Sequence, residues 1–294
     1  EKYISREAIP AQSIVNIADL VLARDIPDDL KEDILKKKGF RDSKKAYKNL
    51  MRIIERTHNK VGFARLAVLA CDWISKKSDP DRALNNWERF MTAVGIPDDY
   101  INLFLAQPVR LDILLDIFSV SQFLADSIIR YPSYFKWVTK LKYLYVEEKR
   151  GRLESDLVAI SNSCIDEEEW LDKLRGFKKR EILRIAIRDV SIQAPLTSII
   201  REISLLAEVM VQIVLKRIWQ DLDKEYRDID FLQDSFCILA LGKLGARELN
   251  YSSDIDLLVF YHESVLENTK YSVSEVENIY KKVMEKLKEK LSCY

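Results

Sequence analysis

The chain has 294 residues, of which 32% are charged and 48% hydrophobic, and its 47 basic residues balance its 47 acidic ones. A chain of this length can bury a substantial core in one large domain or two ordinary ones. Because the charges balance, no overall field attracts nucleic acid or an anionic membrane surface, and we expect neither as a partner.

Hydropathy and cysteine usage indicate a cytoplasmic protein. The most apolar long stretch, residues 199–218, contains several charged side chains, so it does not have the character of a membrane span. The cysteines are scattered without the spacing of a zinc site or a disulfide framework, which favours a reducing compartment. They are Cys71, Cys164, Cys237 and Cys293.

Residues 1–227 are predicted to form the first domain, an all-helical array. Apolar residues recur there at helical spacing, and only five glycines interrupt them. Turn and helix-start signals, such as those at residues 26–29, 78–80 and 95–98, predict about eight to ten helices.

Two features of this helical region allow two interpretations each. Residues 42–52 align without gaps on residues 79–89, either as a duplicated unit or as two helix starts with an Asp N-cap, and the absence of a third copy favours the second. Arg180, Arg184 and Arg188 are spaced to share one helix face. That face either contacts phosphate or an acidic partner, or is solvated and paired with Glu181 and Asp189, and the solvated face is the favoured interpretation.

Residues 228–294 are predicted to begin an α/β domain, with strands at 237–241 and 255–261. Asp254 and Asp256 are two positions apart, so both carboxylates project from one face of the second strand. Two carboxylates this close repel each other, and a divalent cation bound between them offsets that repulsion. We therefore predict that both are metal ligands and catalytic residues; the alternative is a solvent-exposed strand end.

The connection between the strands supplies candidate phosphate contacts. Gly242 directly follows the first strand, where a missing side chain lets backbone N–H groups approach an anion and the following residues can open a helix. Lys243, Ser252 and Ser253 could add donors to phosphate oxygens. These four residues form the predicted nucleotide-binding set.

The string ALGKLGARELNYSSDIDLLVFY, residues 240–261, resembles the nucleotidyltransferase superfamily, in particular the bifunctional glutamine synthetase adenylyltransferase/adenylyl-removing enzymes. Residues 78–90, 121–132 and 177–190 extend the resemblance. Lys243 departs from it, since the wider superfamily usually has Gly or Ser at this position. Three further residues of the string stay open between helix capping and substrate contact: Arg247, Glu248 and Asn250.

The resemblance implies a reaction, cofactors and partners. It implies a Mg²⁺-dependent nucleotidyltransferase with a two-metal site that uses ATP, ADP and phosphate and acts on a tyrosine of glutamine synthetase. A nitrogen signal protein of the PII type would be a second partner. The string at residues 177–190 is more similar to the N-terminal half, which removes AMP, than to the half that adds it.

In this family the chain continues past the last helix into a strand with a third carboxylate. We therefore expect a fragment that is weakly active or inactive alone. The alternative function is a helical binding module that docks on glutamine synthetase or a PII protein without catalysis. A nucleotidyltransferase acting on RNA ends is disfavoured by the neutral charge.

An amphipathic helix is predicted at residues 272–293. Ser272 and Glu275 have the spacing of a capping box, in which each side chain bonds the backbone N–H of the other. One face of the helix is apolar. It carries Val276, Ile279, Tyr280, Val283, Met284, Leu287 and Leu291.

Overall fold

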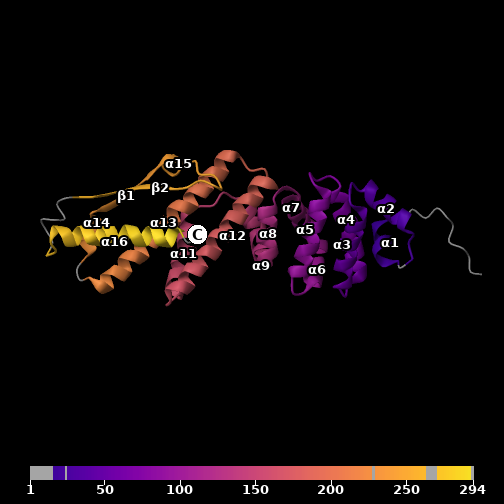
Figure 1. Ribbon diagram of the computed structural model, residues 1–294, viewed down its shortest axis with the longest axis horizontal. Coiled ribbons are helices and arrows are strands. Elements are labelled where there is room, and N and C mark those ends of the chain that lie inside the picture. The colour runs from indigo at the N-terminus through magenta and orange to yellow at the C-terminus, as the bar shows by residue number, and fades with distance from the viewer. Residues whose placement is uncertain (1–15, 24, 227–228, 263–269, 293–294) are drawn as a thin grey trace, which may run out of the picture. The chain divides into compact units, whose positions relative to one another are not determined.

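The computed structural model describes residues 16–23, 25–226, 229–262 and 270–292 (Figure 1). It divides the chain into two compact units, Glu1–Trp137 and Val138–Tyr294. The prediction of a mostly α-helical chain with a small α/β part is confirmed. The division predicted after residue 227 falls inside the second unit, and residues 227 and 228 lie outside the described ranges.

The first unit consists of short helices whose apolar faces share one core. Trp87 and Phe104 are fully buried in it, and Phe90 meets Tyr100 edge to face with ring centroids 4.9 Å apart. The helices are α1 (Ile17–Leu22), α2 (Asp28–Lys37), α3 (Ser43–Glu55), α4 (Lys60–Ile74), α5 (Pro80–Ala93), α6 (Pro97–Ala106), α7 (Pro108–Val120), α8 (Gln122–Arg130) and α9 (Pro132–Val138), which ends at the boundary.

The two aligned segments of this unit are capped helix starts. The Asp42 carboxylate accepts a hydrogen bond from the Lys45 N–H at 2.9 Å, and Asp79 accepts one from Arg82 N–H at 3.1 Å. Pro80 occupies the first position of α5, where its missing N–H costs no helical bond. The local capping signal therefore accounts for the similarity.

The second unit is built around α13 (Leu196–Glu225), which has 30 residues. Its buried residues share one apolar cluster with those of the neighbouring helices and the small sheet. The other elements are α10 (Leu141–Leu144), α11 (Arg150–Ser163), α12 (Glu167–Val190), α14 (Asp230–Asp234), β1 (Phe236–Leu241), α15 (Gly242–Gly245), β2 (Asp256–Tyr261) and α16 (Val273–Ser292).

More helices are present before residue 227 than the sequence predicts. Thirteen, α1 to α13, lie within the described residues up to Glu225. Some neighbouring helices are separated by a single residue. Gln107 is the C-cap of α6 and the N-cap of α7, and Ser121 is the C-cap of α7 and the N-cap of α8. None of the described helices is both long and apolar enough to cross a membrane.

Strands β1 and β2 pair antiparallel, with a register that runs from Phe236 opposite Tyr261 to Leu241 opposite Asp256. One face of the pair rests on the core through alternate residues, because successive side chains of a strand point to opposite faces. These inward residues include Ile238, Ala240 and Leu257. The opposite face carries exposed side chains, among them Leu239, Leu241, Leu258 and Phe260.

The capping box predicted for the last helix is confirmed. Ser272 N–H donates to the Glu275 carboxylate at 2.7 Å, and Glu275 N–H donates to the Ser272 hydroxyl at 3.4 Å. The apolar face packs on the core, where the Tyr280 ring stacks on Phe236 and Tyr261 at centroid distances of 5.4 and 4.8 Å. The helix α16 is therefore fixed to the strands by aromatic contacts.

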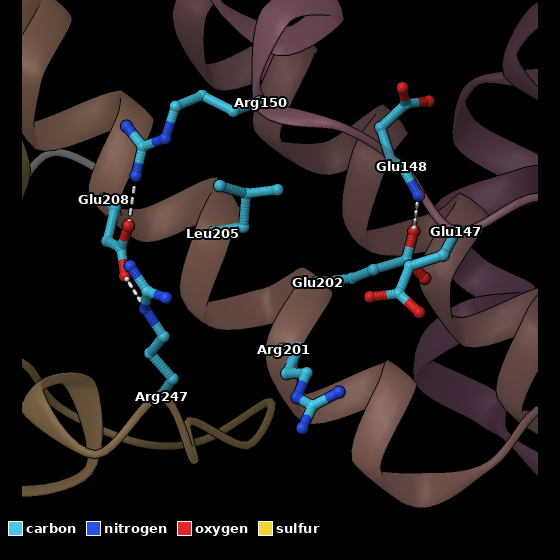
Figure 2. Close-up of a pocket in the computed structure, with 8 residues that line it drawn as sticks. All are labelled: Glu147, Glu148, Arg150, Arg201, Glu202, Leu205, Glu208 and Arg247. Atoms are coloured by element: carbon cyan, nitrogen blue, oxygen red, sulfur yellow. Dashed lines mark hydrogen bonds and ion pairs between the residues drawn. The ribbon is translucent and has the colours of Figure 1, made fainter.

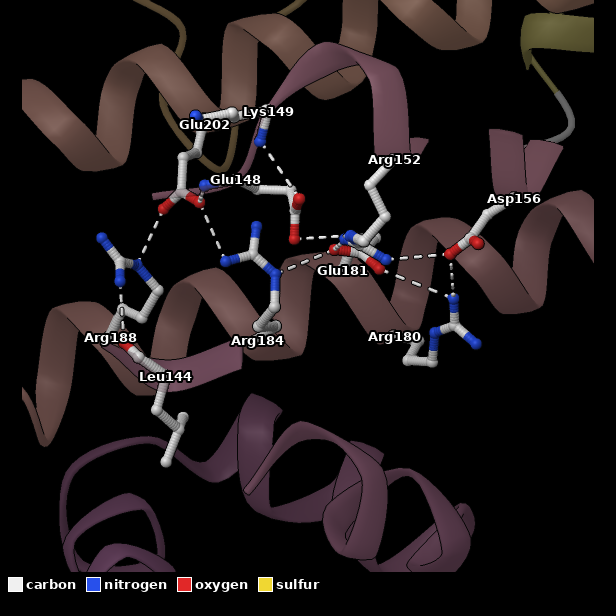
Figure 3. A network of polar contacts seen from close by, with 10 residues as sticks. All are labelled: Leu144, Glu148, Lys149, Arg152, Asp156, Arg180, Glu181, Arg184, Arg188 and Glu202. Atoms are coloured by element: carbon white, nitrogen blue, oxygen red, sulfur yellow. Dashed lines mark hydrogen bonds and ion pairs between the residues drawn. The ribbon is translucent and has the colours of Figure 1, made fainter. Parts of the chain in front are cut away.

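The prediction that the arginines of α12 form a solvated face is wrong for Arg184 and Arg188, although the predicted pairing with Glu181 is present. Arg184 and Arg188 are only 1% and 5% exposed. Both guanidinium groups pair with the Glu202 carboxylate of α13 at 2.8 Å, and Arg184 also donates to Glu181 at 2.8 Å (Figure 3). Buried charges persist when they are paired and hydrogen-bonded in this way.

The same network continues onto α11 and the segment before it. Arg152 pairs with Glu181 at 2.7 Å and with Glu148 at 2.5 Å, and the Glu148 N–H donates to Glu202 at 2.8 Å (Figure 3). Burial lowers the pKa of Arg152, but its bonds to Glu181 and Glu148 raise it more, so the guanidinium stays charged. These ion pairs connect α11, α12 and α13.

Candidate functional site

A glycine turn joins β1 to the loop that carries the aspartates. Gly242 has a φ of +55°, in the left-handed region where a side chain is strained. A Cβ built on Gly245 would lie 2.5 Å from the Ala240 carbonyl oxygen, so α15 approaches β1 more closely than a side chain would permit. Both glycines are therefore required by the path of the backbone.

Asp256 is the first residue of β2, and Asp254 lies in the loop two residues before it. Both are exposed, whereas Ile255 and Leu257 pack on the core, and this alternation places the two acids on the outward side. A Cβ built on Gly242 would lie 3.1 Å from Asp256 Oδ2, so the carboxylate stands directly beside the glycine turn. Asp256 of the predicted acid pair is therefore a neighbour of the predicted phosphate turn.

The two serines before the aspartates belong to a tight turn organised by Asn250. The side-chain oxygen of Asn250 accepts from the Ser253 hydroxyl at 2.7 Å and from the Ser252 N–H at 3.1 Å. Lys243 reaches the Ser253 hydroxyl at 3.5 Å. Lys243 and Ser253 therefore lie together, and Asn250 has a structural role that the sequence left open.

The loop is held to the helices behind it by three hydrogen bonds. The first two go to α13: the Leu249 N–H donates to the Ser204 hydroxyl at 3.1 Å, and Arg247 Nε donates to Glu208 at 2.9 Å. In the third, the Tyr251 hydroxyl donates to Asp189 of α12 at 3.1 Å. Burial, reinforced by the nearby Asp189 carboxylate, raises the pKa of Tyr251, so this hydroxyl keeps its proton.

Carboxylate oxygens are the ligands that Mg²⁺ prefers, and the exposed Asp254 and Asp256 side chains could supply them, with Asp256 beside the turn. Within the described ranges, no group of three or more His, Cys, Asp or Glu side chains is placed to hold a metal ion. The metal role of the two aspartates therefore stays a prediction, as does the nucleotide role of the turn.

A second feature lies against the first half of α13, a pocket of about 250 Å³ with acidic and basic walls (Figure 2). Arg247 of the motif loop forms part of its rim, so the loop borders this pocket as well. The lining consists of Glu147, Glu148, Arg150, Arg201, Glu202, Leu205, Glu208 and Arg247. The predicted nucleotide-binding residues are not among them.

The residues that support the loop were not identified from the sequence. Ser204 and Glu208 precede their loop partners by 45 and 39 residues, and Asp189 precedes Tyr251 by 62. The hydrophobic periodicity of a helix does not indicate which side chains from distant parts of the sequence contact that helix. Ser204 and Glu208 are polar interruptions in the apolar pattern of α13, which was the only signal at these two positions.

A comparison with protein-family models gives a match to the model described as glutamate-ammonia ligase adenylyltransferase. The match covers residues 111–294, which is more than half of the chain and includes the whole of the second unit. The glycine turn, the aspartates and the supporting helices all lie inside the matched range.

Proposed function

Because the chain belongs to the glutamate-ammonia ligase adenylyltransferase family, we propose that its β1–β2 connection is a nucleotidyl-transfer site acting on glutamine synthetase. The family consists of nucleotidyltransferases. The observation that supports a site at this place is the juxtaposition of Asp256 with the turn at Gly242, at 3.1 Å from the Cβ position. A transferred phosphoryl group needs both an anion-accepting turn and carboxylates that hold a cation.

Each predicted residue has a role in this proposal. Asp254 and Asp256 would hold Mg²⁺, and the metal would stabilise the charge that grows on the attacking and leaving oxygens of the phosphorus centre. Gly242 leaves room for the nucleotide phosphates to approach the backbone. Lys243, Ser252 and Ser253 would be donors for phosphate oxygens, and Lys243 lies 3.5 Å from the Ser253 hydroxyl.

The preferred direction is removal of AMP. An oxygen of inorganic phosphate attacks the phosphorus of the adenylylated tyrosine, the tyrosine oxygen leaves and takes up a proton, and ADP is formed. Addition of AMP from ATP passes through the same phosphorus centre. The similarity of residues 177–190 to the AMP-removing half supports the first direction. Glutamine synthetase and a PII-type protein are the proposed partners, in the cytoplasm.

Titration calorimetry with Mg-ADP tests the site. We expect weak binding by the whole chain, reduced about tenfold or more in Asp254→Asn/Asp256→Asn, because the charge that holds the metal is lost. The matched control is Asp223→Asn/Asp234→Asn, which removes two exposed carboxylates elsewhere in the second unit and should bind as the parent does.

Equal binding by the two double variants would contradict the proposal. A chain that binds glutamine synthetase or a PII protein with no dependence on Asp254 and Asp256 would instead fit the alternative, a docking module without catalysis. Pull-down of each partner with the same variants separates these results.

A further inference from the structure

The pocket on α13 contains an arginine whose charge is not neutralised. Arg201 is exposed and lines the pocket, and among the described residues it has no ion pair or hydrogen bond (Figure 2). Its guanidinium group offers five N–H donors in a planar fork. That fork matches the two oxygens of a carboxylate or a phosphate.

The pocket already shows how its arginines bind an oxyanion. Glu208 places its carboxylate between two guanidinium groups, accepting from Arg247 Nε at 2.9 Å and pairing closely with Arg150 (Figure 2). One carboxylate thus serves two cations. Arg247 is 68% exposed and keeps further donors free for a second oxyanion.

Three of the four acidic residues that line the pocket are already paired with arginines other than Arg201. Glu202 is occupied by the arginines of α12, and Glu148 pairs with Arg152 at 2.5 Å. Glu147 is exposed and accepts from the Ser198 hydroxyl at 3.0 Å. Glu147 is therefore the one lining acid without an ion pair among the described residues, and it disfavours a polyanion such as a nucleotide triphosphate.

We propose that this pocket binds a small oxyanion, a carboxylate or a phosphate group, held bidentate by Arg201 with Arg247 as the second donor. The volume of about 250 Å³ suits a compact metabolite. The site is additional to the phosphate turn, with which it shares no predicted residue. Since Arg247 belongs to the motif loop, an occupant would also contact that loop.

Calorimetric titrations of the whole chain with succinate and with inorganic phosphate, without added metal, test this site and separate the two sources. We expect at least one of them to bind. In Arg201→Gln its dissociation constant should rise about tenfold, the effect of losing a charge-assisted hydrogen-bond pair. The control is Lys216→Gln, another exposed cation on α13 outside the pocket, which should bind as the parent does.

The proposal is overturned if neither anion binds the parent, or if Arg201→Gln and Lys216→Gln bind both anions equally well. Phosphate bound at the glycine turn would be lost in Lys243→Ala and retained in Arg201→Gln. If phosphate binding depends on Lys243 in this way and Arg201→Gln does not weaken succinate binding, the proposed pocket site is also overturned. Arg201 makes no hydrogen bond or ion pair with the described residues, so its replacement should leave the fold intact, as circular dichroism can verify.

Discussion

Gly242 illustrates how one residue links the strand, the turn and the acid pair. Its left-handed backbone conformation turns the chain immediately after β1, and the space above its Cα is bordered by Asp256. A side chain at this position would strain the backbone and would also lie close to the Asp256 carboxylate. The position therefore constrains the fold and the candidate site together.

We expect Gly242→Ala to lower the free energy of unfolding by about 1–2 kcal/mol, because an L-residue is strained in the left-handed region. Urea denaturation measures this change. The control is Gly151→Ala in α11, where a built Cβ meets nothing within 4 Å. Removing a helical glycine should stabilise the chain there by up to about 1 kcal/mol. Equal effects of the two substitutions would show that Gly242 is unstrained.

At the scale of the elements, buried ion pairs join α12 to α13. Arg184 and Glu202 are each almost completely buried, so neither charge can be hydrated if its partner is removed. Breaking such a pair leaves an uncompensated charge in a low-dielectric environment, which costs far more than the loss of a surface pair. The packing of α12 against α13 therefore depends on these ion pairs being formed.

Arg184→Met should destabilise the second unit by about 3–5 kcal/mol, since it leaves Glu181 and Glu202 short of a buried cation. Guanidinium denaturation followed by tryptophan fluorescence measures the loss. Lys224→Met is the control: it also removes one cation, from an exposed pair with Asp221 on α13, and should cost less than about 1 kcal/mol. A small effect of Arg184→Met would mean that the acids find other partners.

The sequence predicted the elements whose signals are local. Strands β1 and β2, the capping box of α16 and the Asp caps at 42 and 79 all depend on residues close together in the chain. The buried role of Arg184 could not be predicted, because cations four residues apart are typical of a solvated face. Glu202, which reverses that interpretation, lies on another helix.

For the candidate site, the sequence predicted the two strands and the glycine turn. The antiparallel register, which places Leu241 opposite Asp256 and brings Asp256 to Gly242, is seen only in the structure. The supports from Ser204 and Glu208 depend on how the loop packs against α13. No local pattern encodes that packing. The metal, nucleotide and partner assignments stay predictions.

At the scale of the molecule, Tyr280 joins the sheet and α16 within the second unit. Its ring stacks on two aromatic residues of the strands, and its hydroxyl donates to the Leu232 carbonyl at 3.1 Å. Burial, with a smaller effect of Tyr261, raises the pKa of Tyr280 to about 12 from 10.0. The folded chain thus holds this proton more tightly than the unfolded chain.

The stability of the chain should therefore fall as the pH rises from 10 towards 12, because the unfolded state loses the Tyr280 proton first. Tyr280→Phe should weaken this dependence. Urea denaturation at pH 9, 10 and 11 measures it, with Tyr145→Phe, an exposed tyrosine, as the control. An unchanged alkaline slope in Tyr280→Phe would contradict the assignment.

The length of α13 has a mechanical consequence. Glu202 meets the arginines near its start, Glu208 holds the motif loop, and Trp219 meets Phe236 of β1 with ring centroids 5.6 Å apart. At 1.5 Å per residue these contacts extend over about 25 Å of one rigid rod. A rotation or slide of that rod would displace the buried charges, the loop and the sheet in concert, so the three cannot shift independently.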